Sequence, residues 1–184
     1  KIKNLTRELA KFQKHCHLYI IPFGDIQNEI AKSCREEYRT LLFRKYMVET
    51  ANLICDIISA DALITGDSLG QVSSQTLMNM ALVDKSSKRL IFRPLVGFNK
   101  LEVLTLAQKI GTHDISIIPH DDACSLFAPQ NPVTNANENY WDKFNSSQNL
   151  TELLNKAIDT AEVYSVNLKG ELFKKEYFSF DSKR

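Results

Sequence analysis

The sequence contains little glycine, and what it has is not arranged to bind phosphate. Six of its 184 residues are glycine. None of them lies in a G-x-G-x-x-G or G-x-x-x-x-G-K pattern, the patterns that cradle phosphates at the start of a helix. Doubly wound nucleotide-binding sheets usually carry such a loop in their first strand–helix turn. The chain therefore has no first turn of that type.

Paired cysteines, long apolar runs and excess charge are also missing. The four cysteines are scattered without a C-x-x-C pair, which argues against a disulfide scaffold or a zinc site and favours a reduced, cytoplasmic protein. No apolar run approaches membrane-spanning length, and the first residues do not open a secretory signal. The formal net charge of +1 gives no electrostatic case for a stand-alone nucleic-acid binder. We expect no membrane partner.

Apolar residues recur at both helical and strand-like spacing, which predicts an α/β fold. Helical spacing predicts helices over residues 3–16, 25–33, 36–59, 74–83, 99–109 and 150–163. Short apolar runs predict strands over residues 17–23, 61–64 and 90–95. Prolines and asparagines predict a long loop over residues 115–139. The alternation implies a Rossmann-like parallel sheet with helices on both faces, of which only three strands are clear.

The segment from Ile64 to Gln75 organises the chain. It follows a short apolar strand and precedes a helical pattern, so it is predicted to be a strand–turn–helix connection. Ligands of open α/β sheets bind where such turns gather, at the carboxyl ends of the strands. Gly66 allows the backbone to approach a ligand closely or to turn sharply. An ordinary serine-capped turn is the alternative interpretation of the same residues.

The sequence of residues 65–77, T-G-D-S-L-G-Q-V-S-S-Q-T-L, closely resembles the signature of the ThiI family. Members of that family are PP-loop ATP pyrophosphatases that make 4-thiouridine in tRNA. The similarity runs from about Leu18 to Val163. It includes R-P-L-V-G at residues 93–97 and D-D-A-C-S-L-F-A-P at residues 121–129. The resemblance implies a tRNA sulfurtransferase, which is also linked in many organisms to sulfur supply for thiamine.

The sequence also departs from the family pattern. The PP-loop S-G-G-x-D-S, the THUMP domain and a rhodanese domain are absent. We therefore expect residues 1–167 to form a PP-loop domain that lacks its first strand–helix unit, and residues 168–184 to form a strand or a mobile tail. Because the phosphate cradle is absent, this segment alone is expected to be inactive.

The resemblance places ATP-binding positions on Arg44, Gly66 and Gln75. Arginine suits phosphate or a base, and a carboxamide can both donate and accept hydrogen bonds, as adenine or ribose requires. Asp67 and Ser68 are adjacent candidates for ribose or magnesium contact. ATP and Mg²⁺ are the expected cofactors, and no residues are assigned as protein ligands of a metal. Without the resemblance, the alternative interpretation of Arg44 and Gln75 is that they are exposed helix residues.

Cys124 is the candidate for sulfur chemistry. By resemblance, ATP adenylates the C4 oxygen of a tRNA uridine, and persulfide sulfur then displaces AMP. Cys124 either carries the persulfide or resolves a disulfide. The other cysteines, Cys16, Cys34 and Cys55, fall in or beside predicted helices and are interpreted as packing residues. Expected partners are tRNA and a cysteine desulfurase as persulfide donor, and a homodimer remains open.

Two alternatives stay open from the sequence alone. The chain could belong to another PP-loop tRNA thiolase or to an amidotransferase-type synthetase, although the T-G-D-S-L-G-Q string argues against both. It could also be an interaction or dimerisation module that kept the fold and lost the ATP chemistry. The sequence upstream of Lys1 separates these hypotheses.

Overall fold

The computed structural model describes residues 1–13, 16–120, 127–147 and 150–175. The chain divides into two compact units. Unit 1 comprises Lys1–Pro22, Lys100–Asp121 and Ala157–Arg184, and unit 2 comprises Phe23–Asn99 and Asp122–Lys156. The division between the units falls inside the last helix.

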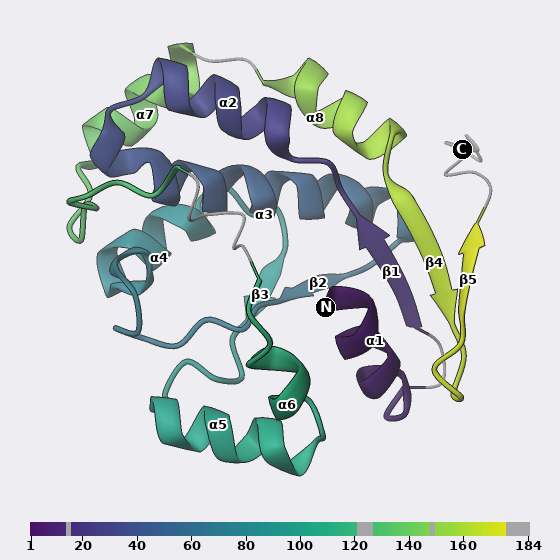
Figure 1. Ribbon diagram of the computed structural model, residues 1–184. Coiled ribbons are helices and arrows are strands. Elements are labelled where there is room, and N and C mark those ends of the chain that lie inside the picture. Colours follow the sequence, from purple (N-terminus) through teal and green to yellow (C-terminus); the bar gives the residue numbers. More distant parts are fainter. Residues whose placement is uncertain (14–15, 121–126, 148–149, 176–184) are drawn as a thin grey trace. The chain divides into compact units, whose positions relative to one another are not determined.

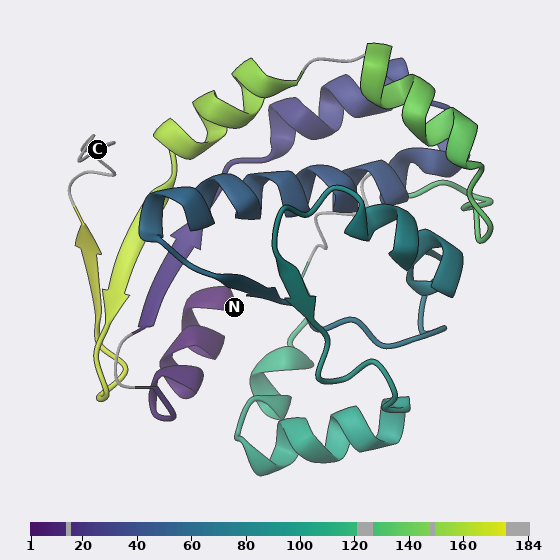
Figure 2. The ribbon, with the colours of Figure 1, turned by 180° about the vertical axis from the view of Figure 1, so that it is seen from behind.

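Unit 2 is built on one long helix. Its elements are α2 (Gly24–Ser33), η1 (Glu36–Tyr38), α3 (Arg39–Ile58), β2 (Ala62–Ile64), η2 (Ser73–Gln75), α4 (Leu77–Asp84), β3 (Leu90–Phe92) and α7 (Glu138–Ser147). Helix α3 lies between α2 and α4, as Figures 1 and 2 both show. Its buried Leu41, Leu42 and Phe43 form the centre of the core. The helix ends at Ser59, whose φ of 56° is left-handed.

Two strands of unit 2 form a parallel pair. Ala62 pairs with Leu90, Leu63 with Ile91 and Ile64 with Phe92. The connection between the strands contains α4, which is the strand–helix–strand arrangement predicted from the sequence. Thr76 caps α4 by accepting a hydrogen bond from the backbone N–H of Asn79 at 3.3 Å.

Unit 1 contains an antiparallel sheet. Its elements are α1 (Ile2–Ala10), β1 (Cys16–Ile20), α5 (Lys100–Lys109), α6 (His113–Ser116), the end of α8 (Thr151–Asp159), β4 (Glu162–Val166) and β5 (Leu172–Lys175). The strand order is β1–β4–β5, with α1 beside β1 (Figure 1). Gly170, with a φ of 77°, turns the chain between β4 and β5.

The α/β class predicted from the sequence is confirmed, but the sheet differs from the expectation. Strand β1 pairs antiparallel with β4 instead of joining β2 and β3 in one parallel sheet. Strand β4 was missed because its sequence continues the apolar spacing of α8, although Val163 and Val166 are β-branched and suit a strand. The expected boundary between residues 167 and 168 falls in the turn of the β4–β5 hairpin.

Several helix limits also differ from the prediction. Helix α1 ends at Ala10 rather than at Cys16, because Cys16 is paired with Val166 in the sheet. Helix α4 begins three residues later than predicted, after its cap at Thr76. Helix α7 was not predicted. It is mostly polar, and its buried side chains Trp141 and Phe144, three residues apart, pack it into unit 2.

The long loop predicted over residues 115–139 is held against α4 in the part that the structure describes. The side chain of Asn79, which is fully buried, donates to the backbone oxygens of Ser73 and Val133 at 2.9 Å each and accepts from the N–H of Ala136 at 3.1 Å. Thr76 donates to the backbone oxygen of Thr134 at 2.7 Å. These bonds fix the segment against the start of α4.

Candidate functional site

The predicted site lies at the carboxyl ends of β2 and β3, within unit 2. Thr65 extends the pairing by donating its N–H to the oxygen of Phe92 at 3.0 Å. Beyond this point the two chains leave the sheet, one into the turn that carries Asp67 and the other into Arg93. Parallel strands place both turns at the same edge, which is where open α/β sheets hold ligands.

The carboxylate of Asp67 is the centre of the polar groups at this edge. The residue is only 3% exposed. Arg44 of α3 forms an ion pair with Oδ1, which also accepts from Nε2 of Gln75 at 3.2 Å. The other oxygen, Oδ2, accepts from the hydroxyl of Thr65 at 2.7 Å and from Nε of Arg93 at 3.1 Å. Four donors therefore surround one carboxylate.

The electrostatics of the cluster favour the ionised acid. Burial acts to raise the pKa of Asp67, but hydrogen bonds from Arg44 and Thr65, together with the positive charge of Arg44, outweigh it. The pKa of this carboxyl group therefore lies below its ordinary value. Two guanidinium groups against one carboxylate leave an excess of positive charge, which Asp84 offsets through its ion pair with Arg93. The carboxylate of Asp84 is largely exposed, whereas that of Asp67 is not.

Arg44 retains donor capacity after its contact with Asp67. Only its Nη2 is engaged there, and its buried Nε has no hydrogen-bond partner among the residues that the structure describes. A buried N–H without a partner costs free energy unless something else accepts from it. The side chain of Arg44 as a whole is 21% exposed, and through that exposed part its guanidinium can meet an anionic ligand as well as Asp67.

Gln75 is positioned by its backbone as well as by its side chain. Its N–H donates to the oxygen of Val72 and its own oxygen accepts from the N–H of Gly70, both at 2.9 Å. Gly70 has a φ of 73°, a left-handed conformation that glycine adopts without strain. The closed turn holds the carboxamide of Gln75 against Asp67.

Gly66 is different from Gly70, because its backbone does not require glycine. It is exposed, its φ is not positive, and a Cβ placed on it would meet no atom within 4 Å among the described residues. Neither the backbone conformation nor the packing therefore requires glycine at position 66. The space beside Gly66 is open to a ligand.

Ser68 is engaged inside the fold. It is 5% exposed, and its hydroxyl donates to the backbone oxygen of Phe98 at 2.6 Å. The next residue, Leu69, donates its N–H to the oxygen of Val96 at 3.0 Å. Ser68 therefore ties the turn after β2 to the chain after β3.

Sequence reasoning assigned no role to Arg93 or to Asp84. The available signal was position: Arg93 lies near the carboxyl end of the strand predicted over residues 90–95, where side chains converge on a site. Its partner Asp67 lies 26 residues away along the chain. Only the pairing of β2 with β3 brings the two side chains together.

Cys124 lies outside the described residues. Of the other cysteines, Cys55 is buried in α3, and Cys34 follows α2, where burial raises the pKa of its thiol to about 11. Cys16 lies in β1, not beside a helix as predicted. A raised pKa keeps a thiol protonated at neutral pH and unreactive, so Cys34 is a poor candidate for sulfur transfer.

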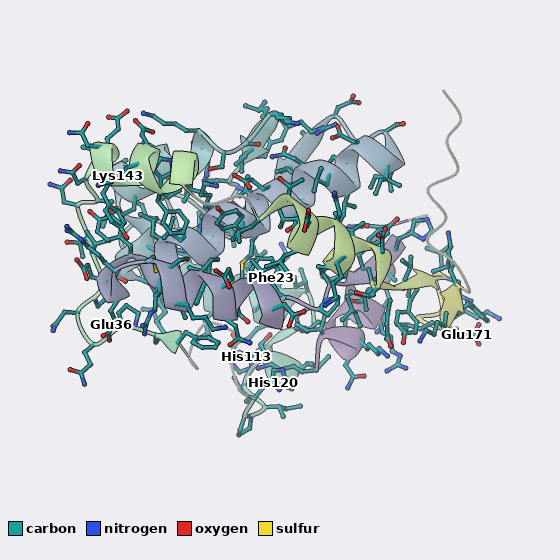
Figure 3. The ribbon with its side chains drawn as sticks, turned by 90° about the horizontal axis from the view of Figure 1, so that it is seen from above. Phe23, Glu36, His113, His120, Lys143 and Glu171 are labelled. Atoms are coloured by element: carbon teal, nitrogen blue, oxygen red, sulfur yellow. The ribbon has the colours of Figure 1, made fainter. Side chains whose placement is uncertain are left out.

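Two hollows lie elsewhere on the surface, and neither is lined by the predicted site residues. A hollow of about 520 Å³ in unit 2 is lined by Arg35, Tyr140 and Lys143 among others, and Figure 3 labels Lys143 on α7. A second, of about 540 Å³ in unit 1, is lined by Cys16, His17 and their neighbours. Neither contains a predicted ATP-binding residue. The described part of the chain holds no cluster of metal-ligating side chains and no helix long and apolar enough to cross a membrane.

Comparison with known proteins gives a consistent result. The sequence model of the family described as "Thiamine biosynthesis protein (ThiI)" matches residues 1–150. The chain is 40% identical over 171 residues to a probable tRNA sulfurtransferase of Thermus thermophilus, and 37% identical over 166 residues to one of Acetivibrio thermocellus. These matches cover 93% and 90% of this chain, but only 42% of each relative.

A solved structure also matches. It is the crystal structure of a 4-thiouridine synthetase–RNA complex with bound ATP, with a TM-score of 0.84 and 31% sequence identity. The match covers 90% of this chain and 44% of that one. The chain thus spans less than half the length of the proteins that it resembles.

Proposed function

Because this chain belongs to the ThiI family, we propose that the full-length protein transfers sulfur to a uridine of tRNA, giving 4-thiouridine, with ATP as the activating substrate. The observation that supports this most strongly is the cluster at the carboxyl ends of β2 and β3. It presents Arg44, Gly66 and Gln75 at one edge of a fold that resembles an ATP-bound 4-thiouridine synthetase. We also propose a link to sulfur supply for thiamine, in keeping with the description of the family.

Each proposed ATP contact has a distinct task. The partly exposed guanidinium of Arg44 suits a phosphate or a base, and the carboxamide of Gln75 keeps its oxygen for a base or ribose. The open space at Gly66 lets the nucleotide lie against the backbone. Asp67 and Ser68 belong to the same site, but their polar atoms are already engaged within the fold.

Magnesium is proposed as the companion of ATP. Both oxygens of Asp67 already accept hydrogen bonds from cationic or neutral donors. A magnesium ion at this site would therefore be held mainly by phosphate oxygens and water, as Mg²⁺ commonly is beside nucleotides. Bound there, the ion would neutralise charge that develops on the phosphate. Arg44 would add a fixed positive charge at the same edge.

Cys124 is proposed to handle the sulfur, as persulfide carrier or as resolving thiol. This assignment rests on the resemblance to the family, because Cys124 lies outside the described residues. The persulfide donor would be a cysteine desulfurase.

The strand pair of unit 2 favours additional covering elements in the full-length protein. Ile64, Leu90 and Phe92 are 74%, 64% and 52% exposed, whereas parallel strands are normally covered on both faces. We infer that further strands or helices complete this sheet and supply the phosphate cradle. On this proposal the 184-residue segment alone does not cleave ATP to AMP and pyrophosphate. Its net charge of +1 gives few phosphate contacts, so its own affinity for tRNA should be weak.

Measuring two half-reactions in one variant tests the proposal. In the full-length protein, supplied with a cysteine desulfurase, cysteine, ATP, Mg²⁺ and tRNA, the change Cys124→Ser should abolish 4-thiouridine while tRNA-dependent release of pyrophosphate continues. Cys55→Ser serves as the matched control, since Cys55 is a buried thiol of α3. Formation of 4-thiouridine at the wild-type rate by the Cys124 variant would remove that residue from the mechanism. Failure of the wild-type protein to thiolate tRNA would refute the function. A cytoplasmic location is part of the proposal, and a homodimer remains open.

A further inference from the structure

We propose that Asp67 and Arg93 are positioning residues for the ATP site: Asp67 holds the side chains of Arg44 and Gln75 in place, and Arg93 holds Asp67. Neither Asp67 nor Arg93 touches the nucleotide in this arrangement. The inference rests on the proposed function, because it concerns how that site is built.

The hydrogen bonds of Asp67 support this assignment over direct contact with ribose or magnesium. Each of its oxygens accepts from two donors, and the residue is almost fully buried. Releasing either oxygen to a ligand would leave a buried donor of Arg44, Thr65 or Arg93 without its acceptor. Such a loss is costly inside a protein. The carboxylate is therefore a fixed acceptor for its neighbours.

The contacts of Arg44 and Gln75 show what this acceptor achieves. Both side chains donate to the same atom, Oδ1 of Asp67, although one comes from α3 and the other from η2. A shared acceptor couples their positions, so a shift of the carboxylate would displace both. Long side chains lose considerable rotamer freedom when they are ordered. Holding them before the nucleotide arrives lowers the entropy cost of binding it.

Arg93 closes the arrangement on the other side. Its Nε donates to Oδ2 of Asp67 at 3.1 Å, and its two terminal nitrogens bind both oxygens of Asp84 at the end of α4. A guanidinium bridges two carboxylates in this way because its donors form a rigid fork, which lysine lacks. The contacts thus run from Asp84 through Arg93 and Asp67 to Arg44 and Gln75.

A double-mutant comparison in the full-length protein tests the inference. Equilibrium affinity for ATP is measured for wild type, Arg93→Gln, Arg44→Gln and the double variant, with the folded fraction checked by thermal unfolding. We expect Arg93→Gln to weaken ATP binding by about tenfold, and to add little once Arg44 is already changed, because coupled residues give non-additive effects. Arg89→Gln is the matched control: Arg89 precedes β3, binds Asp56 instead, and should leave ATP affinity unchanged.

Three results would overturn the inference. Additive losses in the double variant would mean that Arg93 contacts ATP by itself. Unchanged affinity in Arg93→Gln would mean that the cluster is purely structural. A wild-type protein that binds no ATP would overturn the proposed function as well, which distinguishes the two failures. If Arg93→Gln does not fold, Arg93→Lys replaces it, since the retained charge favours folding while the lost fork should still weaken ATP binding.

Discussion

The two ends of strand β3 carry arginine–aspartate clusters of similar composition in very different surroundings. At the carboxyl end, Arg93 and Arg44 bind the buried Asp67. At the amino end, Arg89 binds the exposed Asp56 at 2.6 Å and the backbone oxygens of Ala60 and Asn52 at 2.8 and 3.2 Å. The first cluster includes side chains that can reach a ligand, whereas the second ties the end of α3 to β3.

The difference follows from strand direction, because the candidate ligand-binding side chains lie at the carboxyl ends of the parallel strands and the purely structural contacts lie at the amino end of β3. Parallel strands leave their carboxyl ends facing turns that enter helices, where backbone and side-chain donors gather. In unit 2 the turn after β2 carries Gly66, Asp67 and Gln75 to that end. The amino end receives only the chain arriving from α3 and α4. We expect substitutions at the two ends to have effects of different kind and size.

The largest expected effect on stability comes from Asp67→Asn. The change removes the charge that two guanidinium groups share, and breaking a buried ion pair by removing one partner costs about 3 kcal/mol. Urea unfolding of the full-length protein measures it from the shift in midpoint at unchanged slope. A loss no greater than that of Asp56→Asn would mean that burial does not distinguish the two clusters.

The pH dependence of stability should reveal the same carboxylate. The pKa of Asp67 in the folded state lies below its ordinary value, which is about 3.9 in the unfolded chain. Its contribution is therefore fully present above about pH 4 and is lost as the pH falls through the folded-state pKa. Unfolding free energy measured from pH 6 to pH 2 should fall less steeply in Asp67→Asn than in wild type. Parallel curves would contradict the assignment.

Replacement of Gly70 should have a smaller effect. Gly70→Ala places a Cβ on a residue with a φ of 73°, which costs about 1 kcal/mol, although the surrounding space is open. Thermal unfolding measures the loss. Because Gly70 closes the turn that holds Gln75, ATP affinity should also decrease. A variant as stable as wild type would show that the turn does not need glycine.

Gly66→Ala should leave stability unchanged but weaken ATP binding. The new methyl group meets no atom of the described chain, so any loss of affinity reports on a ligand in that space. Gly24→Ala, at another open glycine of unit 2, is the control for both measurements. Full ATP affinity in Gly66→Ala would mean that the nucleotide does not approach this backbone.

The smallest effect is expected at the amino end of β3. The carboxylate of Asp56 is exposed and its pKa is lowered mainly by the hydrogen bond from Arg89. Ion pairs of this kind are screened by solvent and salt and contribute little. The melting temperature and ATP affinity of Asp56→Asn should both match wild type. A marked loss in either quantity would mean that the exposed Asp56–Arg89 pair matters as much as the buried cluster around Asp67.

The turn after β2 and two of the side chains that meet there could be named from the sequence. The strand–turn–helix pattern around Gly66 located the turn after β2, and the resemblance to the ThiI family, now confirmed, pointed to Arg44 and Gln75. Both side chains do meet at Asp67. The turn was predicted from a local pattern, which a short segment of sequence carries by itself, whereas Arg44 and Gln75 were assigned by the resemblance alone.

The parts that could not be predicted depend on long-range pairing. Nothing near Asp67 in the sequence indicates Arg93, because their contact follows from the register of β2 against β3. The antiparallel pairing of β1 with β4 was missed for the same reason, since strand direction is decided by distant partners. Helix α7 depends on two buried aromatic residues within a polar segment, a weak signal when read alone.

The most direct test of the account compares arginines at the two ends of β3. Equilibrium binding of ATP to the full-length protein is measured for Arg44→Ala and for Arg89→Ala, with the folded fraction of each determined in parallel. The account predicts that Arg44→Ala weakens binding by at least about tenfold, the loss of one charge-assisted contact, while Arg89→Ala binds as wild type does. Equal affinities in the two variants, or a loss confined to Arg89→Ala, would contradict an ATP site at the carboxyl end of this sheet.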